Sequence, residues 1–201
     1  TQIYSAGDLT VKSMANVSGD DVITVDAAGA AAAATGKTNF THLGISGDRA
    51  RSYVSVGNTA SLFGGERLEA SAVTDTKMST SGDGSAFGAG ATLRVDSVTA
   101  STSDNVVTIG ENAVVKSYGD VFLGAGEDYV DANDTSALAG DRLVGYRINS
   151  NDVAASVTSI IGAAIGIPRN NISRATSDQN NILNIARGSK VQSGENIHAA
   201  A

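Results

Sequence analysis

The side chains of this sequence that could do chemistry are concentrated in one acidic stretch, residues 127–135. The stretch offers carboxylate and amide oxygens, the hard ligands that calcium binds in groups of six to eight. They belong to Glu127, Asp128, Asp131, Asn133 and Asp134. The glycine at which an EF-hand loop turns is missing, and so is the Gly-Gly-x-Gly-x-Asp calcium repeat. We expect a solvated acidic loop with no metal and no cofactor, and calcium binding by these five residues stays open as the alternative.

Carboxylates in the same region raise a second chemical possibility, because glycoside hydrolysis uses a pair of carboxyl groups. The candidates are Asp120, Glu127, Asp128 and Asp131. A polysaccharide-cleaving groove also needs aromatic and basic side chains, whereas aromatic residues are 4% of this chain and tryptophan is absent. Neither a Gly-x-Ser-x-Gly elbow nor a phosphate-binding P-loop motif occurs. We therefore expect no catalytic residues and no enzyme.

Composition excludes several other classes of site and partner. The two histidines, His42 and His198, cannot form a usual zinc site without cysteine unless carboxylates join them, so we expect them at surface or strand positions. The absence of cysteine also excludes disulfides. A net charge of −7 disfavours nucleic acid and anionic membranes as partners. The most apolar run, 159–167, is far shorter than the ~20 residues that a bilayer requires, so no membrane insertion is expected.

An apolar skeleton recurs along the chain. Three windows, 54–70, 107–123 and 183–199, align without gaps, and a truncated fourth copy lies at the N-terminus. The aligned sets are Val54, Val107 and Leu183; Val56, Ile109 and Ile185; Ile3, Leu62, Val115 and Val191; Leu9, Leu68, Val121 and Ile197; and Val11, Ala70, Leu123 and Ala199. Successive copies are offset by 59, 53 and 76 residues. The last two offsets differ by 23, which predicts that one module carries an extra coil of about that length.

The spacing within each copy predicts the fold. Apolar residues at every second position are typical of strands with one buried face. Small residues after the first strand and glycine-containing breaks, at 64–65, 118–119 and 193–194, predict sharp corners. Four-residue strands separated by such corners can bury their inward side chains only by stacking one coil on the next. We predict an all-β fold, a parallel β-helix (β-solenoid) of stacked short strands with Gly/Asp/Asn corners.

No linker divides the chain, so we expect one continuous solenoid domain over residues 1–201. Its repeat modules are predicted at about 3–61, 62–114 and 115–190, with a partial copy at 191–201. Segments 22–25 and 93–95 are strand-like. Segment 26–34 has helical propensity, but we favour a strand or tight coil because it occupies the place that 84–91 holds in the next module. Segment 152–161 is the best helix candidate, although it too alternates.

Two phrases of the sequence carry a family resemblance. The skeleton phrase at 107–123 (V-x-I-G-x-N-A-x-V-x-S-x-G-D-V-x-L) and the Gly/Ala-rich phrase at 74–91 resemble the repeats of bacterial filamentous-haemagglutinin-like and leukotoxin-like large surface adhesins. These proteins are exported by two-partner or autotransporter routes. The resemblance implies a right-handed β-helix in an extracellular or cell-surface fibre, and it carries no catalytic residues to transfer.

These observations lead to a functional expectation and an alternative. We expect a non-catalytic structural segment of a secreted or cell-surface bacterial fibre, either an adhesin or a biofilm matrix filament, with an unidentified host-cell or matrix receptor. The alternative is a polysaccharide-binding or polysaccharide-cleaving β-helix. Neither end of the sequence shows a cap, because Lys12, Arg187 and Lys190 are too few and scattered to guard a β edge. We therefore expect head-to-tail self-association or continuation of a longer repeat array.

Overall fold

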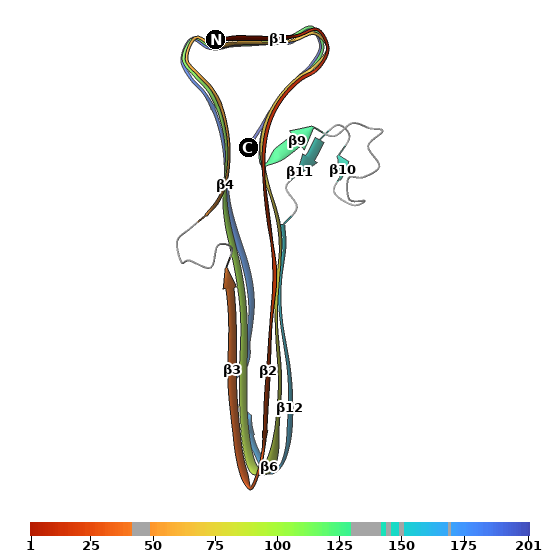
Figure 1. Cartoon of the computed structure of the whole chain (residues 1–201), viewed down its shortest axis with the longest axis vertical. Helices are drawn as coiled ribbons and strands as arrows, with labels where there is room; N and C mark the ends of the chain where they lie inside the picture. Colours follow the sequence, from red (N-terminus) through yellow and green to blue (C-terminus); the bar gives the residue numbers. More distant parts are fainter. Residues whose placement is uncertain (42–48, 130–141, 144–145, 149–150, 169) are drawn as a thin grey trace.

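The computed structural model describes residues 1–41, 49–129, 142–143, 146–148, 151–168 and 170–201. These residues form an all-β structure without helices, and the two larger sheets pair their strands in parallel (Figure 1). The strands are β1 (Gln2–Ser5), β2 (Leu9–Ala28), β3 (Ala31–Thr41), β4 (Ala50–Val56), β5 (Ser61–Gly64), β6 (Leu68–Ile109), β7 (Val114–Ser117), β8 (Val121–Ala125), β9 (Glu127–Tyr129), β10 (Arg142–Leu143), β11 (Tyr146–Ile148), β12 (Asn151–Pro168), β13 (Ile172–Ile185), β14 (Lys190–Gln192) and β15 (Ile197–Ala200).

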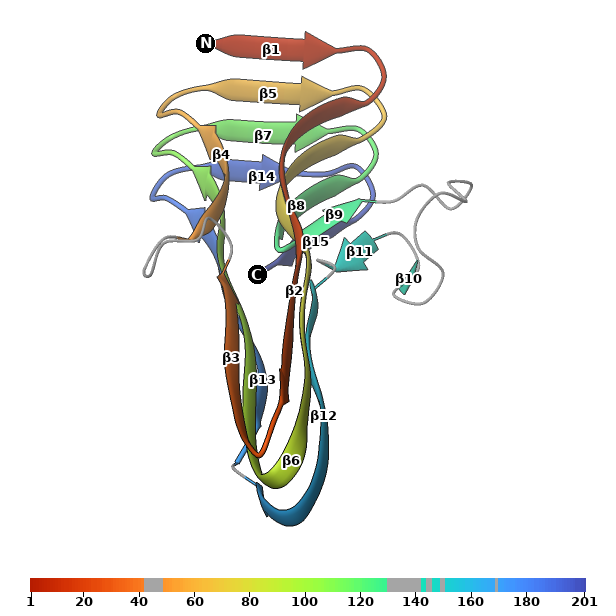
Figure 2. The same cartoon turned by 60° about the horizontal axis from the view of Figure 1, so that its bottom comes forward.

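The chain passes repeatedly around one outline, and we call each pass a level. Level one contains β1 to β4, level two β5 and β6, level three β7, β8, β12 and β13, and level four β14 and β15. Every level begins with a short strand across a broad head (Figure 2). Levels one to three then run down and back along a narrow, two-legged stem. The short strands pair in the order β1–β5–β7–β14, so the levels are stacked in sequence order.

The pairing register confirms the alignment of the sequence copies. Ile3 pairs with Leu62, Leu62 with Val115, and Val115 with Val191. The same agreement holds for the columns Val54–Val107–Leu183, Leu9–Leu68–Val121–Ile197 and Val11–Ala70–Leu123–Ala199. Because side chains alternate between the two faces of a strand, a slip of one residue would have turned these columns outward.

The long offset between levels two and three does not come from an extra coil, so that expectation is wrong. Paired residues of levels two and three are 53 positions apart in the sequence at Ala72 and Ala125, and 75 positions apart at Thr76 and Asn151. Between these points the chain turns at Gly126, whose φ is +83°, and leaves the stack. The described strands of this side insertion, β9, β11 and β10, form an antiparallel sheet (Figure 1). One further residue is added between β12 and β13.

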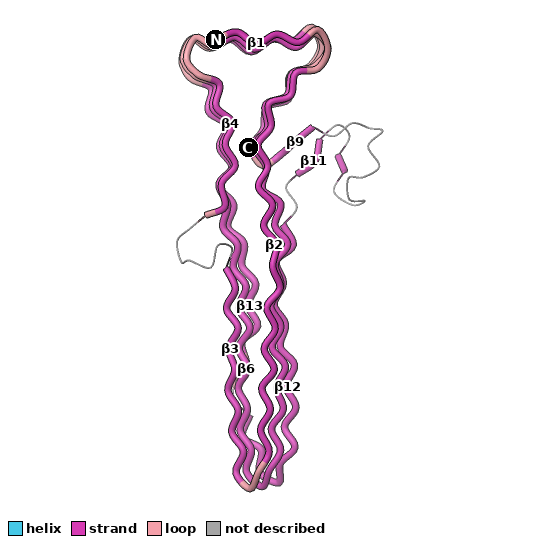
Figure 3. Tube along the Cα trace, viewed as in Figure 1, coloured by secondary structure: helices cyan, strands magenta, loops and turns pink. Residues whose placement is uncertain are grey.

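The expectation of short strands is correct in the head and wrong in the stem. β1, β5 and β7 have four residues each, whereas β2 has 20 and β6 has 42. β6 pairs with neighbouring levels on both sides of the bend at the tip, so a single strand forms both legs of level two (Figure 3). The reason is that no proline interrupts the backbone ladder along 68–109, and inward and outward positions alternate along most of this segment.

Segments with helical propensity are also strands. Segment 26–34 ends β2 and begins β3, in register with the equivalent part of β6, which confirms the strand interpretation. Segment 152–161, the best helix candidate, lies within β12, so helix is the wrong interpretation there. Pairing with the neighbouring level outweighs the weak intrinsic preference of alanine-rich segments for helix.

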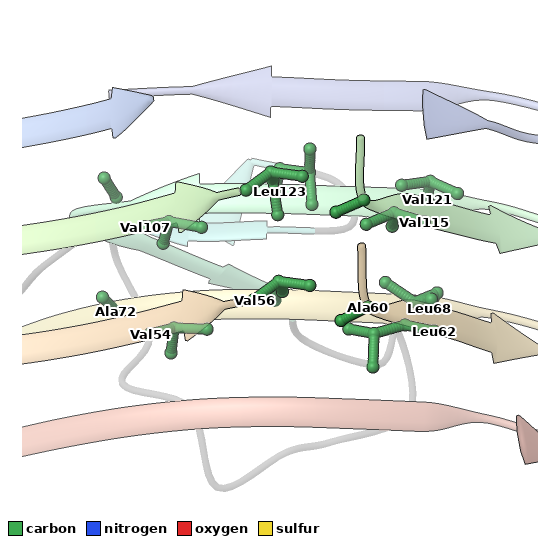
Figure 4. Close-up of a cluster of buried hydrophobic side chains, with 14 residues drawn as sticks. Val54, Val56, Ala60, Leu62, Leu68, Ala72, Val107, Val115, Val121 and Leu123 are labelled. Carbon is green, nitrogen blue, oxygen red and sulfur yellow. The ribbon is translucent and has the colours of Figure 1, made fainter. Parts of the chain in front are cut away.

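The head is filled by small aliphatic side chains, as the composition predicts. Its buried cluster contains Val54, Val56, Ala60, Leu62, Leu68, Ala70, Ala72, Val107, Ile109, Ala113, Val115, Val121, Leu123 and Ala125. Side chains from successive levels lie above one another, as Val54 and Val107 show (Figure 4). No aromatic ring belongs to this cluster, so its buried area comes from stacking many small groups.

The two legs of the stem approach closely near its tip, where Ala34, Ala86, Ala91, Leu93 and Val95 form a second buried cluster. Glycines make this approach possible. A Cβ atom added at Gly82 or Gly84 would lie 2.5 Å from a methyl carbon of Val95 on the opposite leg. Glycine on one leg therefore accommodates valine on the other.

Between the two apolar clusters the legs meet through buried polar side chains, a region that we call the waist. The Oγ1 atom of Thr80 lies 2.5 Å from Oγ of Ser97 and 2.8 Å from Oγ1 of Thr99. The hydroxyl of Thr74 donates to Oδ1 of Asn105 over 2.7 Å. Because a hydroxyl group both donates and accepts, such pairs satisfy polar atoms that have no access to water.

Candidate functional site

The predicted acidic site begins in β9, and each of its two described carboxylates contacts a basic side chain. Oε2 of Glu127 lies 2.9 Å from Nε2 of His198, and the buried Asp128 pairs with Lys12. The other three predicted ligands, Asp131, Asn133 and Asp134, lie outside the described residues, so calcium binding stays a prediction. Within the described part of the chain, no group of three or more histidine or carboxylate side chains is arranged to hold a metal ion.

These two contacts attach the side insertion to the outside of the head. Lys12 belongs to level one and His198 to level four. Level two contributes Glu69, whose Oε1 accepts hydrogen bonds from the hydroxyl of Ser71 over 2.6 Å and from the backbone N–H of Tyr129 over 3.2 Å. β9 follows β8 of level three along the sequence, and it contacts side chains of levels one, two and four.

Aromatic contacts complete this attachment. The ring of Phe122 stacks on His198 with 4.8 Å between centroids, and it meets Tyr129 edge-on at 6.2 Å. The guanidinium carbon of Arg67 lies 3.9 Å from the centre of the Tyr129 ring, a cation–π contact. Phe122 is consequently only 3% exposed, although it lies on the outer face of β8.

Sequence reasoning missed this buried outer surface. Alternation alone places Glu69 and Phe122 outward, and outward positions are normally solvated. The available signal was a glycine: a Cβ atom at Gly124 would lie 2.4 Å from the carbonyl oxygen of Glu127, so only glycine allows β9 to lie against β8.

The remaining predicted residues have separate positions. His198 lies at a half-buried position of a strand, as expected, whereas His42 is outside the described residues. Of the four carboxylates considered for catalysis, Asp131 is not described. Asp120 accepts hydrogen bonds from the backbone and side-chain amides of Asn196, over 3.1 and 3.0 Å. Asp120, Glu127 and Asp128 therefore each contact a different structural partner.

The apolar columns of the head are open at both ends of the stack. Leu62 and Val115, inside their column, are 5% and 0% exposed, whereas Ile3 at the level-one end is 44% exposed. At the other end, Ile185 and Ile197 are 45% and 52% exposed, although the residues above them in their columns are buried. These isoleucines occupy inward positions, and no further member of their columns covers them among the described residues.

The backbone is open at the same two surfaces. In level one, β2, β3 and β4 pair with β6 on one side only, and in level three β12 and β13 do the same. Among the described residues no strand pairs with their other sides. Unpaired N–H and C=O groups in a row are a template for adding another strand. We call these surfaces the upper edge (level one) and the lower edge (levels three and four).

Within the described residues no helix has the length and apolar character needed to cross a membrane. Comparisons with protein-family models, curated proteins and solved structures find no match. The function therefore has to be inferred from the geometry of the chain itself.

Proposed function

We propose that this chain is a section of a β-solenoid fibre, a right-handed parallel β-helix whose role is structural and non-catalytic. The fibre is a secreted or cell-surface bacterial filament, either an adhesin or part of a biofilm matrix. The observation that carries the proposal is the pair of open edges, where inward isoleucines are half exposed while their column neighbours are buried. The extracellular location is supported by the resemblance of 74–91 and 107–123 to repeats of large bacterial surface adhesins.

Additional levels would stabilise the stack by covering its exposed ends. A further level would cover Ile3, Ile185 or Ile197 as Leu62 and Val115 are already covered. Burying the exposed half of one isoleucine stabilises by about 1 kcal/mol, and each new strand would also pair a row of free backbone groups. A stack of this kind becomes more stable as it lengthens, which is the property that a fibre needs.

The lower edge shows where the next strand would lie. Level four contains only the head strands β14 and β15. At the lower edge the head therefore extends one level beyond the stem, which ends at level three. Ala199 pairs with Leu123, which pairs with Ala70, immediately above the stem in level two. A strand that continued from β15 would therefore enter the stem beside β12.

An extension of the chain tests this proposal. We would append a copy of residues 72–109, the stem of level two, directly after Ala200, whose column contains Gly124 and Ser71. Completion of level four is expected to raise the unfolding temperature by several degrees, since 1 kcal/mol corresponds to about 2–4 °C in a chain of this size. Backbone amides of β12 and β13 should also become protected from hydrogen exchange.

The matched control is the same extension without its first residue. This deletion shifts the register by one and turns every inward side chain outward. If both extensions leave the unfolding temperature and the exchange of β12 unchanged, the edges do not accept further levels and the fibre proposal is wrong.

A further inference from the structure

The outer surface of the head carries a second feature, which the stacking of levels does not require. Strands β1, β5, β7 and β14 form a four-stranded sheet whose inward residues include Leu62 and Val115. The alternate residues point outward, and Tyr118 follows β7 in the same alternation. We call this surface the head face, formed by Gln2, Tyr4, Ser61, Phe63, Val114, Lys116, Tyr118, Lys190 and Gln192.

Aromatic rings are gathered on the head face. The rings of Tyr4 and Phe63 stack with 4.9 Å between centroids and 4° between planes, and Tyr118 meets Phe63 edge-on at 5.1 Å. Tyr4 and Tyr118 are 71% and 66% exposed. The chain has only five tyrosines and four phenylalanines, and neither buried apolar cluster contains any of them. Three rings on one exposed surface therefore serve something other than the core.

The charge of the head face is opposite to that of the whole chain. Its outward positions include Lys116 and Lys190 and contain no aspartate or glutamate, whereas the net charge of the chain is −7. Nζ of Lys116 lies 5.7 Å from the centre of the Tyr118 ring. Neither lysine forms an ion pair with another residue of the described part of the chain. Carboxylates begin only in the corner loops that border the sheet.

We propose that the head face binds an acidic polysaccharide, with sugar rings stacked on the aromatic rings and uronate carboxylates paired with the lysines. The aromatic rings supply flat apolar surfaces with polar edges, which suit the C–H face and the hydroxyl rim of a pyranose. Lysine supplies a positive charge on a flexible stem, which can follow a carboxylate along an irregular polymer. Gln2, Ser61 and Gln192 add neutral hydrogen-bonding groups beside the rings.

The same chemistry argues against a single-stranded nucleic acid as the ligand. Single-stranded nucleic acids also stack their bases on aromatic side chains, but they need a positively charged groove along the backbone. Two lysines on a chain of net charge −7 do not supply such a groove. Binding of this face to a uronic acid polymer and binding to single-stranded DNA are therefore separable outcomes.

The test is calorimetric titration of the full chain with polygalacturonate, and with the same polymer fully methyl-esterified, which keeps the sugar backbone and removes the charge. The variants are Tyr118→Ala and Lys116→Gln, each expected to weaken binding roughly tenfold, a loss of about 1.4 kcal/mol. The matched controls are Tyr53→Ala, at a 53% exposed position of β4, and Lys77→Gln, at an exposed position of the stem. Both controls should bind like the parent, and the methyl ester should bind at least tenfold more weakly.

Four results would overturn the proposal. They are no binding of polygalacturonate, an equal loss in Tyr53→Ala, a loss in Lys116→Gln without one in Tyr118→Ala, and equal or tighter binding of poly(dT). The third result would show that charge alone accounts for the binding. Unchanged unfolding temperatures show that the variants are folded. Because these titrations measure a ligand and the extension experiment measures stability, failure of this proposal and failure of the fibre proposal can be told apart.

Discussion

Neighbouring residues of one strand face opposite environments, and Val115 and Lys116 in β7 show this most directly. Val115 is fully buried in the head cluster, whereas Lys116 points outward beside Tyr118. Val115→Asp places an unpaired carboxylate among aliphatic side chains, so we expect a loss of about 3–5 kcal/mol in the free energy of unfolding. Lys116→Asp should change it by about 0.5 kcal/mol or less. Urea denaturation measures both, and equal losses would contradict the register.

A second prediction at the residue scale concerns backbone strain. Thr59, Asn112 and Gly188 occupy the same corner in successive levels, with φ of +58°, +55° and +76°. A β-branched residue is poorly suited to this left-handed conformation, whereas asparagine tolerates it. Thr59→Asn should therefore raise the free energy of unfolding by roughly 0.5–1 kcal/mol, and Asn112→Thr should lower it by a similar amount. Thermal denaturation that ranks the two variants in the opposite order would show that the corner is relaxed in solution.

At the scale of the elements, Arg49 ties three levels of one leg together. Its Nε donates to Oδ1 of Asp104 over 2.6 Å, its Nη1 to Oδ2 of Asp178 over 2.8 Å, and its Nη2 to the carbonyl of Ser103 over 2.8 Å. The hydrogen bond to Asp178, together with Asp104, raises the pKa of Arg49 above its ordinary value. The guanidinium is therefore charged throughout the pH range in which the protein is studied.

This arrangement predicts that removal of the guanidinium lowers the free energy of unfolding modestly and in a salt-dependent way. Arg49→Gln should lower the free energy of unfolding by about 1 kcal/mol, because the pairs are partly solvated and screened. Arg49→Lys keeps the charge but cannot form three directed bonds, so it should recover only part of the loss. Urea denaturation at low and at high salt measures both variants. A loss that is as large in 1 M salt as in dilute buffer would show that packing, and not charge, is responsible.

At the scale of the whole molecule, the two edges predict association. β14 and β15 of one copy can meet β1 and the start of β2 of the next, in a head-to-tail contact that generates an open filament. Within the described residues level four contains only β14 and β15, so in such a contact the stems would be separated by the depth of one strand. We therefore expect weak association, visible as a sedimentation coefficient that rises with protein concentration.

Charged residues at the open columns provide the control for this prediction. The double variant Ile3→Lys with Ile197→Lys places charges at both ends of the apolar columns and should sediment as a monomer. Val22→Lys, at a 64% exposed outward position of β2, should still associate. A parent chain that stays monomeric at every concentration, with β12 protected from hydrogen exchange, would mean that the edges are capped.

The columns of the head follow from the amino-acid sequence alone. Ile3, Leu62, Val115 and Val191 align by their spacing, because a strand alternates its side chains with a period of two and a stack repeats that pattern. The corners are equally predictable: a Cβ atom at Gly65 or Gly194 would lie 1.8 Å from a backbone oxygen of the level above. Such signals are local, so a single sequence is enough to reveal them.

The stem, the side insertion and the covered outer surface depend instead on tertiary contacts. In the waist the inward positions are mostly hydroxyl side chains, whereas the outward positions include Val98 and Ala100, so the polarity pattern does not say which hydroxyl groups point inward. Thr80 and Ser97 are buried only because the two legs meet. The difference of 23 residues between the last two offsets does not indicate where the added residues lie. Glu69 and Phe122 are buried by β9, a segment distant from Glu69 in sequence. Burial of this kind depends on which surfaces come together in three dimensions, and alternation along one strand carries no record of that.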